Sequence, residues 1–189
     1  MSPDEHHRTP AMPAPGASTS ASAVIDVALA PLSREHRDDV RTILEGTDVF
    51  REDEVDVALE VLDSYYDHPG QDYTAVGAFT QAGELLGYVC FGPTPCTLDT
   101  WDLYWIAVAP RTQGTGVGTA LLEEVERRLA RQRARLVIIE TSSQPMYEKT
   151  RRFYLRHGYP EVARVPDFYS EGDDRVIYAK RIQPVTGQE

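Results

Sequence analysis

The segment that most constrains this chain of 189 residues is a glycine-rich run, Arg111-Thr112-Gln113-Gly114-Thr115-Gly116-Val117-Gly118. A strand-like run over 101–108 precedes it, and a run with helical spacing of apolar residues over 119–131 follows it. Glycines at every second position leave backbone N–H groups uncovered where a helix begins, and such unpaired donors suit a phosphate group. The run therefore predicts either an anion-binding loop or a plain glycine-rich turn with a helix cap.

The spacing of these glycines excludes two common phosphate-binding loops. A dinucleotide-binding loop needs G-x-G-x-x-G, and its third glycine would fall at Thr119. A P-loop needs Gly-Lys-Ser/Thr after its spacer, and no lysine lies near the run. The pattern that does fit is Arg/Gln-x-x-Gly-x-Gly/Ala, with Arg111, Gly114 and Gly116 at its defined positions.

The periodicity of apolar residues predicts the remaining elements and their order. The predicted strands are 24–30, 73–80, 84–92, 101–108, 136–140, 159–165 and 175–181, and the predicted helices are 33–46, 51–66, 119–131 and 145–157. The order is β-α-α-β-β-β-α-β-α-β-β. It predicts an α/β (α+β) fold with a mixed sheet of six to seven strands and about four helices. The connection lengths make the sheet antiparallel early and parallel where helix 119–131 crosses over.

A second motif lies on the last predicted helix, Tyr147-x-x-Thr150-x-x-x-Tyr154-x-x-x-Gly158-Tyr159. Together with the glycine run and the element order, it resembles the GNAT N-acetyltransferases over about residues 24–182. The second motif of that family is Asn-x-x-Ala-x-x-x-Tyr-x-x-x-Gly-Phe. This chain matches it at the tyrosine, the glycine and the final aromatic residue, and departs from it at Tyr147 and Thr150.

The resemblance implies transfer of an acetyl group from acetyl-CoA, as co-substrate, to a primary amine. It implies that the loop holds the pyrophosphate mainly through backbone N–H groups and that Arg111 adds charge. The loop residues concerned are Gln113, Gly114, Thr115, Gly116, Val117, Gly118 and Thr119. It further implies that the strand edge at Ile106, Ala107 and Val108 pairs with the pantetheine amides, with the N–H of Val108 facing the thioester oxygen. Tyr147 is expected to line the CoA channel, where the family usually carries Asn.

The same resemblance assigns the proton transfers. Tyr154 is the candidate general acid for the departing thiolate, because a phenol near the sulfur can give up its proton. Asp102 and Glu140 are rival candidates for the general base. A structural or substrate-binding role is the alternative for both carboxylates, and some members of the family use no single base.

Charge is divided unevenly along the chain, whose net charge is −11. Residues 1–110 carry 5 Lys+Arg against 19 Asp+Glu, a balance of −14, whereas residues 111–181 carry 14 against 10, a balance of +4. This division suits an anionic cofactor in one half and a cationic substrate in the other, or it reflects two solvated faces. The expected acceptor side is 48–60 together with the loop 166–169, where Asp167, Tyr169, Asp173 and Asp174 could hold a cationic amine or simply form a turn. Nucleic acid is not an expected partner for a chain this acidic.

The ends of the chain are expected to lie outside a single GNAT domain over 24–183. Residues 1–23 are predicted to be a disordered leader rich in Pro, Ala and Ser, and 184–189 are predicted to be a short flexible tail. The chain shows no apolar signal core and no apolar run of the ~18 residues that span a bilayer, so a cytoplasmic location without membrane contact is expected. Neither a metal site nor a disulfide framework is predicted.

Three functions stay open at this stage. The first is a cytoplasmic N-acetyltransferase, monomeric or homodimeric, acting on a small cationic or amino-acid-like amine. The second is a protein lysine or N-terminal acetyltransferase, which needs an open groove between the connection of the first two helices and the last strands. The third is an acyl-CoA-binding sensor domain without turnover.

Overall fold

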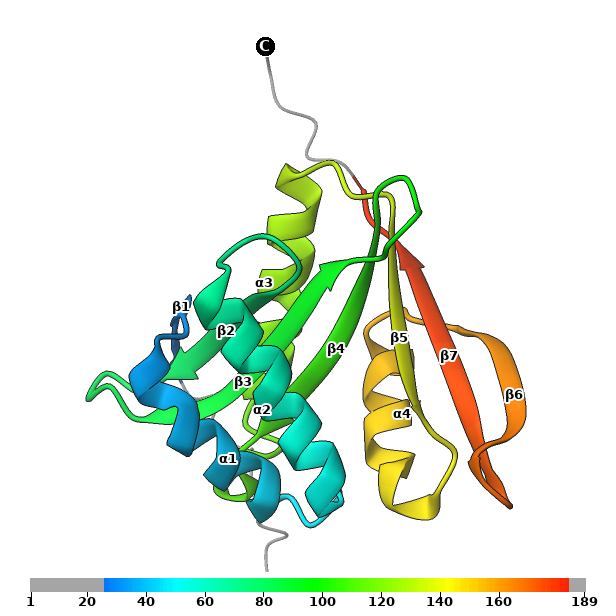
Figure 1. Ribbon diagram of the computed structural model, residues 1–189, viewed down its shortest axis with the longest axis horizontal. Helices are drawn as coiled ribbons and strands as arrows, with labels where there is room; N and C mark the ends of the chain where they lie inside the picture. The colour runs from blue at the N-terminus through cyan, green and yellow to red at the C-terminus, as the bar shows by residue number, and fades with distance from the viewer. Residues whose placement is uncertain (1–25, 184–189) are drawn as a thin grey trace, which may run out of the picture.

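The computed structural model describes residues 26–183, which form one seven-stranded sheet in the order β1-β2-β3-β4-β5-β7-β6 (Figure 1). The strands are β1 (Ala28–Pro31), β2 (Thr74–Phe79), β3 (Leu85–Pro93), β4 (Thr100–Val108), β5 (Leu136–Ser142), β6 (Glu161–Ser170) and β7 (Asp173–Arg181). The helices are α1 (Arg37–Gly46), α2 (Glu52–Asp67), α3 (Val117–Arg131) and α4 (Glu148–Arg156), with short 3-10 helices η1 (Arg34–His36), η2 (Pro110–Thr112) and η3 (Pro145–Tyr147). The predicted leader and tail lie outside the described residues, so the domain boundaries stay predictions.

The predicted fold class and element order are confirmed. Strands β4 and β5 pair in parallel, and every other neighbouring pair in the sheet is antiparallel. The parallel pair is the one that α3 connects, as the long connection between these strands requires. Among the described residues, none of the helices is long and apolar enough to cross a bilayer.

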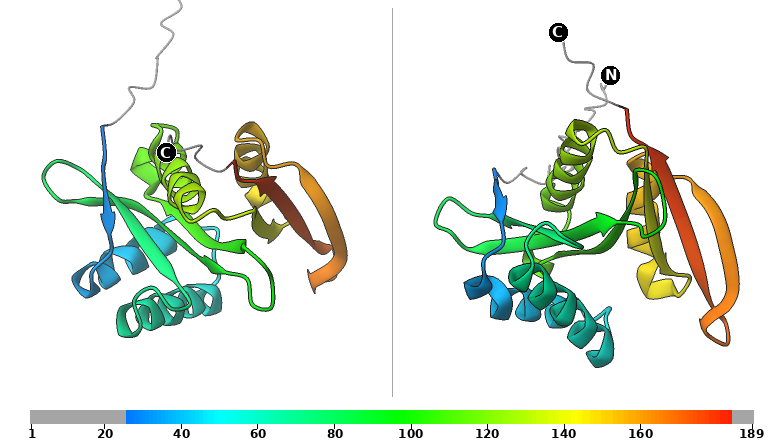
Figure 2. Two further views of the ribbon diagram at one scale, coloured as in Figure 1. Left: turned by 90° about the horizontal axis from the view of Figure 1, so that it is seen from above. Right: turned by 45° about the horizontal axis from the view of Figure 1, so that its top comes forward.

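Two layers of helices enclose the sheet and build two apolar cores. Helices α1 and α2 cover one face, and α3 and α4 cover the other (Figure 2). The apolar stripes predicted from helical spacing point inward in both layers. On α2 the buried residues are Val55, Ala58, Leu59 and Leu62; on α3 they include Leu121, Leu122, Val125 and Leu129. Burial of these stripes is the main favourable contribution to holding the helices on the sheet.

The last hairpin differs from the prediction. The segment 166–169, predicted as a loop, belongs to β6, which runs to Ser170. The β6–β7 register shifts between Val165 and Ser170, so the segment bulges out of regular pairing. Pro166 is tolerated there because β6 is an edge strand, where a missing backbone donor faces outward. The first strand is also shorter than predicted and begins at Ala28.

The feature that positions a site is the partial pairing of β4 with β5. The two strands pair only from Thr100–Leu103 opposite Leu136–Ile139. Beyond that point, residues 104–108 of β4 and 140–142 of β5 have no partner in each other. We call this region the strand opening, and the two strands separate there in Figure 1. A β-bulge at Tyr104, which has no opposite residue on β3, adds to the bend of β4.

Candidate active site

The glycine loop lies between η2 and the first turn of α3, as its sequence predicts. Gly114 and Gly116 have φ angles of 78° and 95°, in the left-handed region that favours glycine. Gly116 is the N-cap residue of α3, so the helix begins at Val117, two residues before the predicted start. The positive φ at these two positions turns the chain from η2 into the helix.

The loop presents a row of unpaired backbone donors. Three N–H groups in and next to the loop are satisfied internally. Those of Gln113 and Thr115 donate to the carbonyls of Pro110 and Thr112 (3.3 Å each), and that of Ala120 donates to the carbonyl of Gly116 (2.9 Å). Five other loop N–H groups donate to no acceptor within residues 26–183, namely those of Gly114, Gly116, Val117, Gly118 and Thr119. Donors of this kind at a helix N-terminus fit a pyrophosphate, and the positive end of the helix dipole adds to the attraction.

Two side chains of the loop have partners that the sequence did not predict. Arg111 pairs with Glu84 (Nη2 to Oε1, 2.5 Å), and both side chains are more than half exposed, so this ion pair is weak. The contact of Arg111 with a phosphate stays a prediction. The hydroxyl of Thr119 lies 3.1 Å from Nε2 of His157. Because Nδ1 of His157 lies 2.8 Å from the carbonyl of Phe153, which can only accept, Nε2 of the neutral ring accepts from Thr119. His157 therefore joins the start of α3 to the end of α4.

The free edge of β4 carries the predicted backbone donor. The N–H of Ala109 donates to the carbonyl of Leu86 at the β3 end of the pairing (2.8 Å). Donors alternate in direction along a strand, so the N–H groups of Val108 and Ile106 face away from β3, toward the strand opening. Ala107, between them, points its side chain into the core beneath α1 and α2. The edge at Ile106–Val108 thus has the geometry that the pairing of an extended amide chain requires.

Tyr154 lies on α4 with its ring in the core. Its side chain is 4% exposed, and its ring centroid lies 5.7 Å from that of Tyr178 and 5.6 Å from that of Phe153. Burial raises the pKa of Tyr154 well above the usual value of a phenol. The group therefore keeps its proton at neutral pH, which is the state that a general acid needs.

The two candidate bases occupy different parts of the β4–β5 pair. Asp102 lies in the paired half of β4 and accepts a hydrogen bond from the hydroxyl of Thr94 (2.8 Å). Glu140 is the first residue of β5 beyond the paired half, at the strand opening, and its carboxylate pairs with Arg175 of β7. Since Leu103 and Ile139 belong to the core beneath α3 and α4, both carboxylates point to the opposite face. That face is the expected acceptor side.

Tyr147 joins η3 to the connection between α1 and α2. Its hydroxyl donates to the carbonyl of Val49 in the connection between α1 and α2 (3.3 Å). Burial is the first cause that raises the pKa of Tyr147, and the charge of Glu54 adds to it. The tyrosine therefore ties the start of α4 to the helices on the other face. Its predicted place in the CoA channel stays a prediction.

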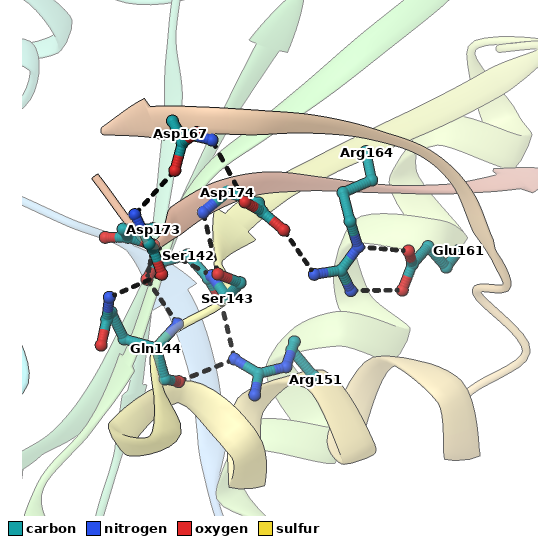
Figure 3. A network of polar contacts seen from close by, with 10 residues as sticks. Ser142, Ser143, Gln144, Arg151, Glu161, Arg164, Asp167, Asp173 and Asp174 are labelled. Carbon is teal, nitrogen blue, oxygen red and sulfur yellow. Dashed lines mark hydrogen bonds and ion pairs between the residues drawn. The ribbon is translucent and has the colours of Figure 1, made fainter. Parts of the chain in front are cut away.

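A polar network holds the tip of β5 against the β6–β7 hairpin (Figure 3). The buried carboxylate of Asp173 accepts from the hydroxyl of Ser142 (2.6 Å) and from the N–H of Ser143 (3.2 Å). Asp174 accepts from Arg164 (3.0 Å), and Asp167 accepts from the N–H of Gly172 (2.7 Å). Their oxygens satisfy donors of the hairpin and of the β5 tip. These contacts favour the alternative that the three aspartates form the turn, and their part in holding a cationic amine stays a prediction.

Sequence reasoning missed Arg175, the residue that pairs with Glu140 at the opening. Phe168 covers its guanidinium, with the ring centroid 4.7 Å from Cζ. The only available signal was that Arg175 begins a predicted strand, which says nothing about the strand that lies beside it. The pairing of β7 with β5, opposite Ser142, brings the two charges together.

Comparison with known proteins agrees with this geometry. The model of the acetyltransferase (GNAT) family matches residues 37–159. A solved structure from Desulfovibrio desulfuricans, assigned to the GNAT family of acetyltransferases, is 40% identical with a TM-score of 0.79 and covers 83% of this chain and 99% of that one. An aminoglycoside 6'-N-acetyltransferase complexed with coenzyme A shares the fold, with a TM-score of 0.65 at 19% identity over 85% of this chain and 99% of its own.

A curated relative from Methanocaldococcus jannaschii, an uncharacterized N-acetyltransferase, is 30% identical over 77 residues. The match covers 40% of this chain and 48% of the relative, so it spans about half the length of that protein.

A mixed sheet that opens between β4 and β5, with unpaired donors at the start of α3, agrees with the family match, which makes the protein an acyl-CoA-dependent N-acyltransferase. The chain belongs to the GNAT acetyltransferase family. The expected family, enzyme class and co-substrate, acetyl-CoA, are thereby confirmed.

Proposed function

We propose that this protein transfers an acetyl group from acetyl-CoA to a primary amine of a small molecule, one that is cationic or amino-acid-like. The observation that carries the proposal is the set of five unpaired N–H groups in the glycine loop, those of Gly114 and of 116–119, together with the free edge of β4. Binding at both places would hold an acyl carrier along the opening, with its reactive end directed at the acceptor face.

In this proposal each residue has one task. Acetyl-CoA supplies the activated acyl group. The loop from Gln113 to Thr119 holds the pyrophosphate, and the N–H of Val108 donates to the carbonyl oxygen as negative charge develops on it. When the amine nitrogen attacks and the carbon–sulfur bond breaks, Tyr154 gives its proton to the leaving sulfur. The nitrogen loses its proton to a base or to water, and Tyr154 regains one from solvent.

Glu140 is the better-placed candidate for the base. It lies at the strand opening, whereas Asp102 lies in the paired half of β4, bonded to Thr94. Asp102 remains a rival through a chain of water molecules. A mechanism in which the amine arrives unprotonated and needs neither carboxylate is the third possibility.

The bridge from Tyr147 to Val49 favours a small acceptor over a protein. A polypeptide substrate needs a continuous groove between the α1–α2 connection and the last strands. The hydrogen bond from Tyr147 joins the α1–α2 connection to η3 at one end of that region. The cytoplasmic location and the monomeric or homodimeric state expected from the sequence are part of the same proposal.

Calorimetric titration with acetyl-CoA, followed by thiol release against a panel of amines, tests the function. Binding together with release by one class of small amine is the expected result. Binding without release by any small amine would favour the sensor domain, unless peptides with a free N-terminus or lysine release thiol, which would make the protein acetyltransferase the better reading. Absence of binding would remove the basis of the whole proposal.

A further inference from the structure

Glu140 of β5 and Arg175 of β7 form an ion pair at the strand opening. Among the described residues, no other ion pair joins β5 to β7. Glu140 on β5 and Arg175 on β7 are diagonal neighbours, because Glu140 lies opposite Ile177 and Arg175 lies opposite Ser142. Both side chains are partly accessible, at 35% and 28% exposure. The pair therefore presents one negative and one positive group side by side at the strand opening.

Arg175 has more donors than the protein satisfies. A guanidinium carries five N–H donors. Among residues 26–183 the only hydrogen bond from this side chain runs from Nη2 to Glu140, and Nε is buried without an acceptor. The protein encloses Nε and keeps it out of reach of a ligand. Nη1 has no hydrogen-bond partner among these residues and is not buried, so its two donors are open to an acceptor from outside the protein.

Phe168 covers one face of the guanidinium of Arg175. Its ring centroid lies 4.7 Å from Cζ of Arg175, within the range of a cation–π contact. The ring is itself packed edge-on against Tyr169, with centroids 4.9 Å apart. The contacts with Phe168 and Glu140 restrict the guanidinium, so it loses less freedom when Nη1 and Nη2 bind a carboxylate through two parallel hydrogen bonds.

From these contacts we infer that the acceptor is an α-amino acid, whose carboxylate binds Arg175 and whose amino group lies at Glu140. An α-amino acid carries an ammonium group and a carboxylate on the same carbon atom. Its two charges can therefore face the opposite charges of Glu140 and Arg175, which are in direct contact. A polycation would place a second positive charge near Arg175. The inference deepens the proposed function and rests on it for the turnover of the amino group.

The test compares amino acids with the amines that remain when the carboxylate is removed, such as phenylalanine with phenethylamine and lysine with cadaverine. Thiol release from acetyl-CoA is measured for the twenty amino acids and their matched amines. At least one amino acid is expected to show a kcat/KM about 100-fold above its matched amine, because a bidentate charged contact is lost with the carboxylate. Equal kcat/KM values for amino acids and their matched amines would overturn the inference and leave the proposed function standing.

Variants of Arg175 supply the second arm. Arg175→Gln is expected to raise the KM for the amino acid about 30-fold while the KM for acetyl-CoA changes less than about twofold. Arg175→Lys should restore only part of the affinity for the amino acid, because an ammonium group cannot donate two parallel hydrogen bonds to a carboxylate. Arg164→Gln is the matched control. Arg164 lies on the same hairpin, but its guanidinium is already paired with the carboxylates of Glu161 and Asp174, so the KM for the amino acid should not change. An unchanged KM in Arg175→Gln would overturn the inference.

A direct binding experiment separates failure of the inference from failure of the proposed function. If acetyl-CoA binds but no acceptor releases thiol, the proposed function fails. The amino acids are then titrated into the protein saturated with coenzyme A. If an amino acid binds to the wild type and Arg175→Gln abolishes that binding, the amino-acid site is supported. If none of the twenty amino acids binds, the inference is overturned.

Discussion

Single residues of the glycine loop combine two demands on the backbone. Gly116 adopts a left-handed φ of 95° as the N-cap of α3, and its neighbours leave their N–H groups unpaired. The first demand concerns stability, and the second concerns a ligand. Substitutions can separate the two demands, because Gly172 also has a positive φ but lies outside the glycine loop.

Gly116→Leu is expected to lower the free energy of unfolding by about 1–2 kcal/mol, because a side chain at positive φ is strained. It should also weaken acetyl-CoA binding by about tenfold or more, since the added side chain keeps the phosphates from approaching the backbone N–H groups of the loop. Gly172→Leu is the control, with a φ of 77° in the β6–β7 turn and open space around it. Denaturant unfolding should show a similar cost for both variants, and calorimetry should show lost affinity only for Gly116→Leu. Equal affinities would contradict the loop assignment.

Tyr154→Phe is expected to lower kcat about 100-fold with the affinity for acetyl-CoA unchanged, because only the proton donor is removed. Since burial raises the pKa of Tyr154, the protonated form persists above the usual range of a phenol. In the wild type, loss of this acid should therefore produce no fall in kcat as the pH rises to about 10. Tyr159→Phe, in the same core, serves as the control and should keep full turnover. A kcat close to wild type in Tyr154→Phe would exclude it as the acid.

At the scale of elements, the site depends on how α1 and α2 are held together above the acceptor face. Arg37 of α1 donates through Nε and Nη2 to both carboxylate oxygens of Asp63 on α2, each at 2.8 Å. These hydrogen bonds lower the pKa of Asp63 below its usual value. The pair joins the two helices whose connection also receives the hydrogen bond from Tyr147.

Because the folded pKa of Asp63 is depressed, its contribution to stability is present above the unfolded pKa of about 3.9 and is lost as the pH falls through the lower folded pKa. We expect Asp63→Asn to be less stable than wild type at neutral pH, with the difference shrinking on acidification below about pH 4. Urea unfolding of both proteins across this range measures it. Asp56→Asn, on the same helix, is the control: its carboxylate is exposed and 3.4 Å from Arg41, so little change is expected. A difference for Asp63→Asn that stays constant down to the lowest pH would contradict the argument.

Over the whole molecule, charge is divided between the two halves of the chain, with a balance of −14 in residues 1–110 and +4 in residues 111–181. The glycine loop and α3 belong to the second half, and α1 and α2 belong to the first. Such a division raises the local concentration of an anionic co-substrate near the loop, and salt screens the effect.

Salt should therefore act differently on the two substrates. The KM for acetyl-CoA is expected to rise several-fold between about 0.05 and 0.5 M NaCl, because its phosphates are attracted over a distance. The KM for an α-amino acid should change less, since its net charge is near zero. Steady-state kinetics at several salt concentrations measures both. An acceptor KM that rises more steeply than that of acetyl-CoA would indicate a cationic acceptor instead.

By itself, the sequence determined the family, the order of the elements and the position of the glycine loop. These follow from local patterns: apolar spacing in α2 and α3, glycine where φ is positive at Gly114 and Gly116, and a tyrosine on α4 seven residues after its N-cap residue Tyr147. Each pattern acts within a few turns or strand residues, so it can be read before the chain is folded.

Only the tertiary structure decided which polar groups stand free at the strand opening. Asp167, Asp173 and Asp174 looked like anchors for an amine, yet the hairpin and the β5 tip use their oxygens. Arg175 carried no signal, yet it meets Glu140 because β7 pairs with β5 across a long sequence separation. A polar group that is already hydrogen-bonded or paired within the protein has less capacity to bind a ligand. Which charged side chains can bind a ligand therefore depends on partners that only the packed sheet brings together.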